Sequence, residues 1–200
     1  MKHWELWKRA AEHGGRGLDA GQLESLDRYL GWLRREAIPA GALGPGEEGR
    51  LAARHIGDSL LFASPLPTEV AEIWDLGSGA GLPGIPLALL MPQTRVVLVE
   101  RSGGRAQLLR RVLRILGLEN TEVRETDINT LDGRAQVLVS RGVLPAEKAG
   151  DMARRLLQPG GMAVWGGSWM AEPSAPGWET VEIPEDVLDH RVWLLIMRPQ

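Results

Sequence analysis

An acidic residue followed at once by a run of glycines is the feature of this chain best suited to chemistry. Asp75 lies at the end of an apolar stretch, and Gly77, Gly79 and Gly81 follow it within six residues. Glycine has no Cβ, so the backbone of such a turn can approach a ligand closely. A helix-compatible run, 85–90, comes directly after the glycines. Strand, glycine-rich turn and helix in this order indicate a nucleotide-cofactor site.

Two cofactor classes fit this turn, and a purely structural turn is a third alternative. Residues 79–84 formally match the dinucleotide fingerprint Gly-x-Gly-x-x-Gly. However, Pro83 has no N–H to offer a pyrophosphate, and the carboxylate of Asp75 would repel it. S-adenosylmethionine (SAM) carries a sulfonium and an ammonium group and no phosphate. An acidic residue ahead of Gly-x-Gly-x-Gly therefore favours SAM.

A second carboxylate follows at the spacing that a cofactor site requires. The apolar run 95–100 is typical of a buried parallel strand, and it ends in Glu100. An acid about 20 residues beyond the glycines commonly accepts hydrogen bonds from ribose hydroxyls. NAD and SAM both have an unphosphorylated ribose, whereas the 2′-phosphate of NADP would be disfavoured. The alternative for Glu100 is a solvated strand end.

Composition limits the class of protein further. Two hundred residues, 44% hydrophobic and 24% charged, suit one globular domain with an appendage. The absence of cysteine excludes disulfides, thiolate nucleophiles and cysteine-based zinc sites. A net charge of −3 and a pI near 5.9 argue against generic nucleic-acid binding but allow a local arginine patch. With no apolar leader and no apolar run of 18 residues, we expect a cytoplasmic protein without a membrane span.

The first part of the chain, residues 1–68, is expected to form a small helical cap. Apolar residues at spacings of three and four predict one helix through Leu23, Leu26, Leu30 and Leu33, and Trp4 and Trp7 suggest a shorter one before it. The stretch 37–49 is rich in Gly, Pro and Ala and predicts a loop. A third helix is expected over 51–62, followed by proline breakers.

From residue 69 onward, strand and helix patterns alternate, and we expect residues 69–200 to form the cofactor-binding domain. Strands are expected at 72–76, 96–100, 121–125, 136–140, 162–166, 179–183 and 192–197, and helices at 105–116 and 147–157, the latter closed by Pro159-Gly160-Gly161. This alternation predicts an α/β fold with a parallel, doubly wound sheet, and the last two strands suit an antiparallel closing pair. Ligands of such sheets bind beyond the carboxyl ends of the strands, where Asp75, Glu100, Asp127 and Arg141 all fall.

The segment that begins at Asp75 resembles the first motif of the RsmG (GidB) family of 16S ribosomal RNA guanine-N7 methyltransferases. Its tail, Gly-Leu-Pro-Gly-Ile-Pro-Leu, is far more specific than the glycines alone. Three further segments resemble family motifs in the right order: Arg54-His55-Ile56-Gly57-Asp58-Ser59-Leu60, Gly103-Gly104-Arg105 and Val139-Ser140-Arg141. The similarity covers about residues 20–200 and is strongest over 54–118.

The resemblance implies a class I SAM-dependent methyltransferase, Rossmann-like, with a mostly parallel seven-stranded sheet, an antiparallel closing strand and an N-terminal helical cap. It implies SAM as cofactor and 16S rRNA or the small ribosomal subunit as partner. The residues expected at the cofactor, from the loop pattern and the resemblance together, are Asp75, Gly77, Gly79, Gly81, Leu82, Glu100, Asp127, Ile128 and Arg141. His55 and Asp58 would lie where the cap meets the core.

Methyl transfer to guanine N7 needs no general base, because N7 carries a free lone pair, so no catalytic residue is named. Arg141 could hold the RNA backbone or the cofactor carboxylate, and Arg105, with Arg110, Arg111 and Arg114, could contact phosphate. A solvated helix face is the alternative for the helix arginines. We expect a monomer that needs no metal ion.

The sequence also departs from the family pattern. Gly104 stands where the family has lysine, Gly142 where it has alanine, and Gly41-Ala42-Leu43 where it has Asn-Leu-Thr. These changes fall on the substrate side more than on the cofactor side. Three alternatives therefore stay open: a SAM-dependent methyltransferase acting on another acceptor, a non-catalytic SAM-binding relative, and an NAD-dependent oxidoreductase.

Overall fold

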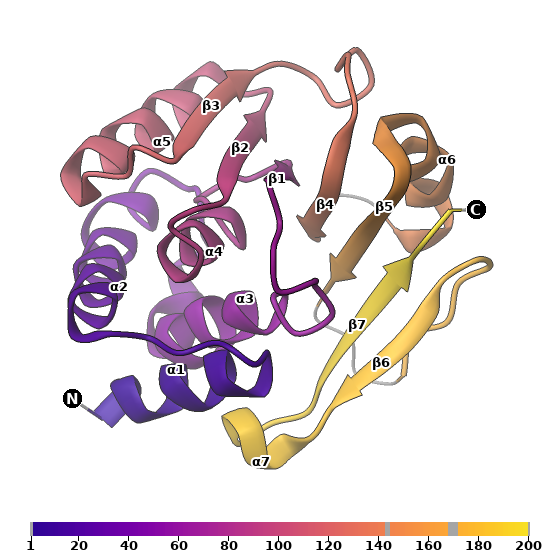
Figure 1. Cartoon of the computed structure of the whole chain (residues 1–200). Coiled ribbons are helices and arrows are strands. Elements are labelled where there is room, and N and C mark those ends of the chain that lie inside the picture. Colours follow the sequence, from indigo (N-terminus) through magenta and orange to yellow (C-terminus); the bar gives the residue numbers. More distant parts are fainter. Residues whose placement is uncertain (1, 143–144, 168–171, 200) are drawn as a thin grey trace.

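The computed structural model describes residues 2–142, 145–167 and 172–199, and a seven-stranded sheet forms its centre (Figure 1). The strands are β1 Glu72–Leu76, β2 Arg95–Glu100, β3 Thr121–Glu125, β4 Ala135–Arg141, β5 Leu157–Gly166, β6 Glu179–Ile183 and β7 Val192–Met197. Their order is β3-β2-β1-β4-β5-β7-β6. The first five run parallel, and β7 runs antiparallel to both β5 and β6. The predicted doubly wound sheet with an antiparallel closing pair is confirmed.

The order of the strands places a topological switch point at β1. The chain proceeds from β1 to β2 and β3 on one side, and then crosses to β4 and β5 on the other. Asp75 in β1 is in register with Leu98 of β2 and with Val139 of β4. The carboxyl ends of these three strands therefore lie side by side, which is where doubly wound folds bind their ligands.

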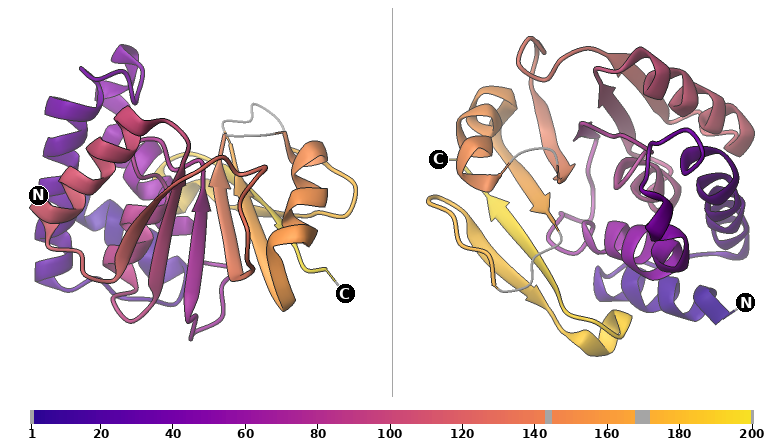
Figure 2. Two further views of the ribbon diagram at one scale, coloured as in Figure 1. Left: turned by 90° about the horizontal axis from the view of Figure 1, so that it is seen from above. Right: turned by 180° about the vertical axis from the view of Figure 1, so that it is seen from behind.

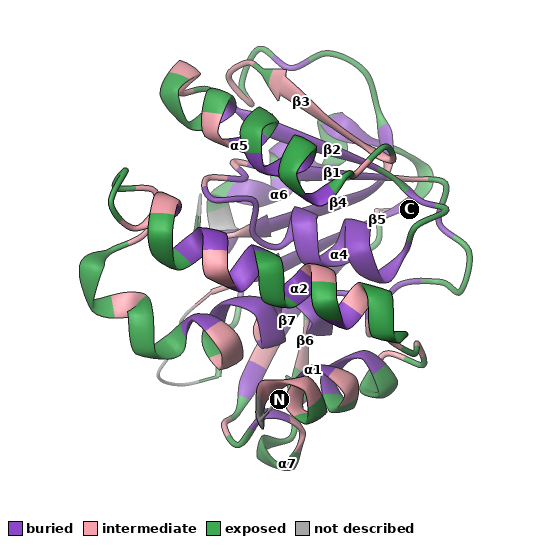
Figure 3. Ribbon diagram, turned by 90° about the vertical axis from the view of Figure 1, so that its left-hand side faces the viewer, coloured by how far each residue is buried: buried purple, intermediate pink, exposed green. Residues whose placement is uncertain are grey.

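Helices cover the sheet unequally (Figure 2). On one face, α4 Gly84–Leu90 and α5 Gly103–Leu116 pack on β1, β2 and β3, and α2 Ala20–Trp32 packs on those two helices. Every residue of α4 is buried (Figure 3). A helix that is apolar on all sides is stable only in such a buried layer. On the opposite face α6 Ala146–Leu156 contacts β4, β5 and β7.

The three helical segments predicted before residue 68 are present, with irregular turns among them. They are α1 Lys2–His13, α2 continued by a π-helical turn Leu33–Ala37, and a π-helical segment Leu51–Gly57 that leads into α3 Asp58–Leu61. The predicted loop contains a 3₁₀ segment, Pro45–Arg50, with proline in its first turn, where a missing N–H is tolerated. One continuous apolar core joins Trp7 and Tyr29 to Leu87 and Val164, so the division at residue 68 stays a prediction.

The prediction for β5 is wrong at its start. β5 begins at Leu157, which is in register with Ala135, before the ladder resumes with Met162 opposite Val137. The segment Pro159-Gly160-Gly161, expected to close a helix outside the sheet, therefore lies within this strand as a bulge. Gly160 has a φ of +75°, a conformation that glycine adopts without a steric penalty. Pairing at Leu157 extends the strand beyond what the turn residues indicate.

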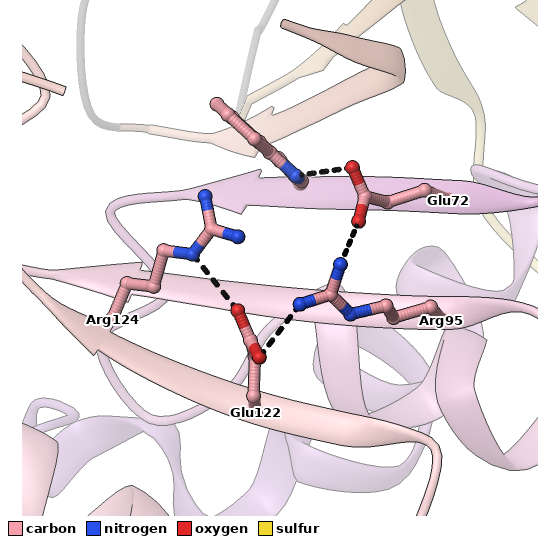
Figure 4. Close-up of polar contacts among 5 residues, drawn as sticks. Glu72, Arg95, Glu122 and Arg124 are labelled. Carbon is pink, nitrogen blue, oxygen red and sulfur yellow. Dashed lines mark hydrogen bonds and ion pairs between the residues drawn. The ribbon is translucent and has the colours of Figure 1, made fainter. Parts of the chain in front are cut away.

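No helix lies between β3 and β4 in the structure, and charged side chains cover the sheet face there instead (Figure 4). Arg95 pairs with Glu72 at 2.6 Å and with Glu122 at 2.8 Å, and Arg124 pairs with Glu122 at 2.8 Å. The Trp74 indole donates to Glu72 at 2.8 Å, and the Arg124 guanidinium lies 4.8 Å from the Trp74 ring centroid. Together with Leu131 and the backbone at Gly133, which pack on the same side chain, this network leaves Trp74 only 3% exposed without a covering helix.

No helix in the described part of the chain combines the length and the apolar character that crossing a membrane requires.

The network predicts a measurable contribution of Arg95 to stability. Arg95→Ala removes two ion pairs and uncovers the region of Trp74, so it should lower the free energy of unfolding by about 1–2 kcal/mol. Arg198→Ala is the matched control, since Arg198 is equally exposed (52% against 51%) but has one isolated pair with Glu179. Urea unfolding of both variants measures the difference; equal losses would contradict the cooperative role of the network.

Candidate cofactor and substrate site

The loop from β1 to α4 passes through backbone conformations that require glycine. Gly77, Gly79 and Gly81 have φ values of +71°, +57° and +96°. A Cβ on Gly81 would overlap the side chain of Ile85, and one on Gly84 would overlap Leu98 as well as lie 2.7 Å from the Asp75 carboxylate. The glycines therefore fix the path of the loop and let α4 pack directly on β2.

The N–H groups of this loop are already used by acceptors within the protein. Six of them donate, at 2.7–3.1 Å: Gly77 and Ser78 to the Val99 carbonyl, Gly79 to Glu100 Oε2, Gly81 and Leu82 to the Ser78 carbonyl, and Gly84 to Asp75 Oδ2. The Ala80 N–H is not among these donors. Pro83 has no N–H. A pyrophosphate needs an array of free donors of this kind, so the geometry disfavours the dinucleotide alternative on grounds independent of the charge of Asp75.

Asp75 lies beneath the loop. Its side chain is fully buried; Oδ2 accepts the Gly84 N–H at 3.0 Å, and Oδ1 has no partner among the described residues. Burial raises the pKa of this carboxyl to about 7. Asp75 was predicted as a cofactor contact, but it lines neither of the neighbouring cavities. The structure gives it a supporting position, from which it holds the first turn of α4.

Glu100 occupies the position expected of a ribose acceptor. It is 4% exposed, and each of its oxygens accepts one backbone N–H, Oε2 from Gly79 at 3.0 Å and Oε1 from Ser102 at 2.8 Å. A carboxylate has about four acceptor sites, so acceptor capacity is left over for hydroxyl groups. Because Glu100 also lines a cavity, it can present those sites to a ligand.

Two adjoining cavities, of about 490 and 240 Å³, lie at the carboxyl ends of β1, β2 and β4. They share the lining residues Ala42, Gly77, Arg141 and Gly142; the larger adds Glu100, Arg105, Asp127 and Ile128, and the smaller adds His55, Gly79 and Leu82, among others. We call the two together the cleft. The structure thus brings together every predicted site residue except Asp75 and Gly81, both of which support the loop instead.

The segment after β3 supplies a second acid to the cleft. Asp127 Oδ1 accepts from the backbone and side-chain N–H groups of Asn129, both at 2.8 Å, and Oδ2 lies 3.7 Å from Arg101 Nη1. The backbone hydrogen bond from Asn129 lowers the pKa of Asp127 below its ordinary value. The carboxylate is therefore ionised near neutral pH and is available as an acceptor beside Ile128.

Arg141 is connected to the N-terminal region through His55. Its Nη2 lies 3.2 Å from His55 Nδ1, and its Nη1 donates to the His55 carbonyl at 3.4 Å. His55 Nε2 in turn lies 2.9 Å from Glu47 Oε2. Sequence reasoning placed His55 between cap and core but missed Glu47, since a glutamate within a Gly- and Pro-rich loop carries no periodic signal.

The other polar residues of the Arg54–Leu60 segment fix its geometry. Ser59 Oγ donates to the His55 carbonyl at 2.5 Å, and Asp58 Oδ1 pairs with His190 at 2.7 Å. His190 comes from the turn before β7, 132 residues further along the chain. The segment is therefore held from two sides, which fixes the position of His55.

Arginines gather at a third cavity, of about 740 Å³, between the loop after the second helix and the start of α5. Arg101, Arg105 and Arg111 line it, with Gly41, Gly104 and Gln107; we call it the arginine hollow. Arg111 is paired with Glu36 at 2.9 Å, whereas Arg105 is exposed and has no partner within the described ranges. Arg110 pairs with Glu125 and, like Arg114, does not line the hollow.

The cleft combines a glycine-fixed loop, two acids, and a half-buried arginine. Among the residues that the structure describes, no three His, Asp or Glu side chains are grouped so that they could hold a metal ion. Together with the sheet order, these features define a class I SAM-dependent methyltransferase. Residues 22–172 match the sequence profile of GidB, rRNA small subunit methyltransferase G, and the chain belongs to this family.

Relatives with established names agree with this assignment. The chain is 35% identical over 161 residues to ribosomal RNA small subunit methyltransferase G of Acidothermus cellulolyticus, covering 80% of this chain and 69% of that one. It is 39% identical over 145 residues to the protein of that name from Mycobacterium leprae (strain TN), covering 70% and 58%. The matched part of this chain thus spans 58–69% of the length of these two relatives.

Solved structures with low sequence identity share the fold. A ribosomal protein L11 methylase from Lactobacillus delbrueckii subsp. bulgaricus aligns with a TM-score of 0.53 at 12% identity, covering 74% of this chain and 79% of that one. A precorrin-6y C5,15-methyltransferase from Geobacter metallireducens aligns with a TM-score of 0.51 at 16% identity, covering 70% and 87%. At these identities the likeness concerns the fold alone.

The geometry of the loop predicts that Gly81 tolerates no side chain. Gly81→Ala combines a positive φ with an overlap against Ile85, so it should lower the free energy of unfolding by about 1–3 kcal/mol and weaken SAM binding at least tenfold. Gly104→Ala is the control, since a Cβ there meets nothing within 4 Å. Calorimetric titration with SAM and thermal unfolding give both readings; wild-type affinity in Gly81→Ala would contradict this account of the loop.

The burial of Asp75 predicts a pH-dependent stability. Because its folded pKa is raised from 3.8 to about 7, its ionisation opposes folding; stability is lost as pH rises from 3.8 through about 7 and then levels off. Asp75→Asn keeps an acceptor for Gly84 but has no charge. Relative to this variant, the wild type without cofactor should lose roughly 1 kcal/mol of unfolding free energy between pH 6 and pH 8. Urea unfolding at the two pH values measures it, and a constant difference would refute the buried charge.

Proposed function

We propose that this protein transfers the methyl group of SAM to N7 of a guanine in 16S ribosomal RNA, in the cytoplasm and as a monomer. The observation that carries the proposal is the cleft, where the loop glycines, Glu100, Asp127 and Arg141 meet in a chain of the GidB family. The names of its relatives support small-subunit ribosomal RNA as the substrate class.

The residues of the cleft fit SAM. Glu100 has acceptor capacity left for two ribose hydroxyls, and its burial strengthens those hydrogen bonds. Asp127 can accept from an exocyclic amino group, with the apolar side chain of Ile128 beside it. The unpaired Oδ1 of Asp75 and the carboxylate of Glu100 make the region acidic, which suits a ligand that carries sulfonium and ammonium charges.

The proposed reaction is a direct displacement. SAM supplies a methyl carbon bonded to a positively charged sulfur. The N7 lone pair forms the new N–C bond as the C–S bond breaks; the electron pair stays on sulfur and the positive charge passes to the guanine ring, so no proton is removed. The chain's residues therefore act by binding, alignment and exclusion of water, and the reaction requires none of the cleft's side chains to act as a general base.

The arginine hollow is the proposed contact for the RNA backbone. It shares Arg101 and Arg105 with the surroundings of the cleft, so phosphates bound there would lie next to the reacting base. Arg105 has no ion pair to break within the described ranges, and its guanidinium can bind a phosphate with two hydrogen bonds. A local patch of this kind is compatible with a chain whose net charge is −3.

The family departures lie at the rims of these cavities. Gly104 and Gly41 line the arginine hollow, and Gly142 and Ala42 line the cleft. A Cβ on Gly104 would meet nothing within 4 Å, so this glycine leaves space where a larger side chain would fit. Gly41 and Gly142 also have open space around them, but their φ values of +71° and +72° favour glycine. This observation favours a second candidate, a SAM-dependent methyltransferase whose acceptor differs from that of its relatives.

The proposed function predicts SAM binding without NAD binding and methyl transfer to undermethylated 30S subunits. A calorimetric titration with SAM and with NAD, followed by transfer of labelled methyl to subunits or to small acceptors, separates the candidates. SAM binding with transfer to another acceptor would select the second candidate. SAM binding with no transfer to any acceptor would indicate a binding protein.

The arginine hollow predicts salt-dependent RNA affinity. Arg105→Ala should reduce the slope of log affinity against log salt by about 0.7, as expected for one lost phosphate contact with single-stranded RNA. Arg110→Ala is the control on the same helix, because Arg110 already pairs with Glu125 at 2.9 Å. RNA affinity measured at several salt concentrations gives the slopes; an unchanged slope in Arg105→Ala would remove this arginine from the interface.

A further inference from the structure

We propose that Glu47 and His55 are positioning residues that hold the Arg141 guanidinium in the cleft, ready to bind an oxyanion of the cofactor or of the RNA. The inference rests on the proposed function for the identity of that oxyanion. The arrangement itself, three side chains from three separate elements in one hydrogen-bonded chain, rests on the distances alone.

The donors and acceptors of the three side chains allow only one pattern of hydrogen bonds among them. A guanidinium has only donors, so His55 Nδ1, 3.2 Å from Arg141 Nη2, must accept. A neutral imidazole that accepts at Nδ1 carries its proton on Nε2, and this N–H then donates to Glu47 Oε2 at 2.9 Å. Glu47 thereby selects the tautomer of His55, and the tautomer makes the bond to Arg141 possible.

Arg141 is a half-buried cation that lacks an ion pair. No carboxylate lies within 4 Å of it among the described residues, and it contacts the carbonyl and the ring of His55. Asp58 and Glu47 stabilise its charge only from beyond that distance, so the guanidinium has no direct anionic partner and the site favours an anionic ligand. Arg141 lines both cavities of the cleft, where a cofactor carboxylate or an RNA phosphate would meet it.

The surrounding charges keep His55 in the form that the arrangement needs. Burial first, and then the charge of Arg141, lower the pKa of His55, while Glu47 and Asp58 act in the opposite direction. Arg54 also acts on Arg141, and Arg50 lies 3.7 Å from Glu47. His55 is therefore neutral at pH 7. Protonation would place an N–H on Nδ1 against the guanidinium and break the contact.

Fixing Arg141 in advance matters because its side chain is long. A free arginine side chain carries about 2 kcal/mol of rotamer entropy, which is lost when it binds a ligand. Two hydrogen bonds from the guanidinium to one residue restrict it before the ligand arrives. The effect of Glu47 should therefore pass entirely through Arg141.

A double-mutant cycle tests this coupling. Glu47→Ala should lower kcat/KM for methyl transfer about tenfold with little change in thermal stability, since Glu47 is partly exposed. In the Arg141→Ala background the same change should have no further effect, because the group it positions is gone. Glu47→Gln, which keeps an acceptor, should restore most of the activity. Additive losses in the double variant would overturn the proposal.

The chain offers a matched control at the next residue. Glu48 lies in the same 3₁₀ segment and pairs with Arg34 at 3.3 Å rather than with His55. Glu48→Ala should leave kcat/KM unchanged; a loss equal to that of Glu47→Ala would assign the effect to the segment rather than to the hydrogen bond. If Arg141 holds the cofactor carboxylate, Glu47→Ala raises the Kd for SAM. If it holds phosphate, the KM for RNA rises instead.

A spectroscopic arm separates this inference from the proposed function. Nitrogen-15 shifts of the imidazole report the tautomer of His55 without any ligand or activity. The wild type should show the Nε2–H form with a pKa below 6.5, and Arg141→Ala should raise that pKa. If this result is obtained and no methyl transfer is detected, the proposed function is refuted and the positioning role of Glu47 and His55 is not. A wild-type Nδ1–H tautomer would refute the positioning role whatever the activity.

Discussion

Gly84 lies so close to Leu98 and to the Asp75 carboxylate that no side chain fits there, and this contact fixes where α4 begins. Because α4 is buried on all sides, its position determines how the N-terminal helices lie over the sheet. The same contact ties the loop to a charge beneath it through the bond from the Gly84 N–H to Asp75. The close packing at Gly84 therefore fixes both the path of the glycine-rich loop and the packing of the helices on the sheet.

That constraint also decides what the loop can bind. Six of its N–H groups hold the loop to β1, to β2 and to itself, so the loop does not offer the array of free donors that a pyrophosphate needs. In the function we propose, recognition would therefore depend on the side chains of Glu100, Asp127 and Arg141, which line the same cavity. In that proposal, the carboxylates face the cationic groups of SAM and the arginine faces an oxyanion. The same carboxylates would repel the pyrophosphate of a dinucleotide.

Much of this could be predicted from the sequence, and the exceptions have physical reasons. The alternation of apolar strands and helices predicts the sheet, and strand ends predict Glu100, Asp127 and Arg141 as neighbours. The orientation of Asp75 could not be predicted, because strand position does not say whether a side chain at its end meets the ligand or the following helix. Glu47 and His190 were missed because their partners lie in other elements, and nothing in local periodicity marks such contacts.

The charged network that stabilises the sheet and the residues that line the cleft lie at opposite ends of the strands. Glu72 and Arg95 are the first residues of β1 and β2, so the charged network that replaces a helix lies toward the amino ends of these strands. The cleft and the arginine hollow lie at the opposite ends, where Gly104 leaves open space. A substitution at Gly104, where a Cβ would meet nothing within 4 Å, is therefore expected to alter the rim of the hollow without disturbing the network or the buried loop.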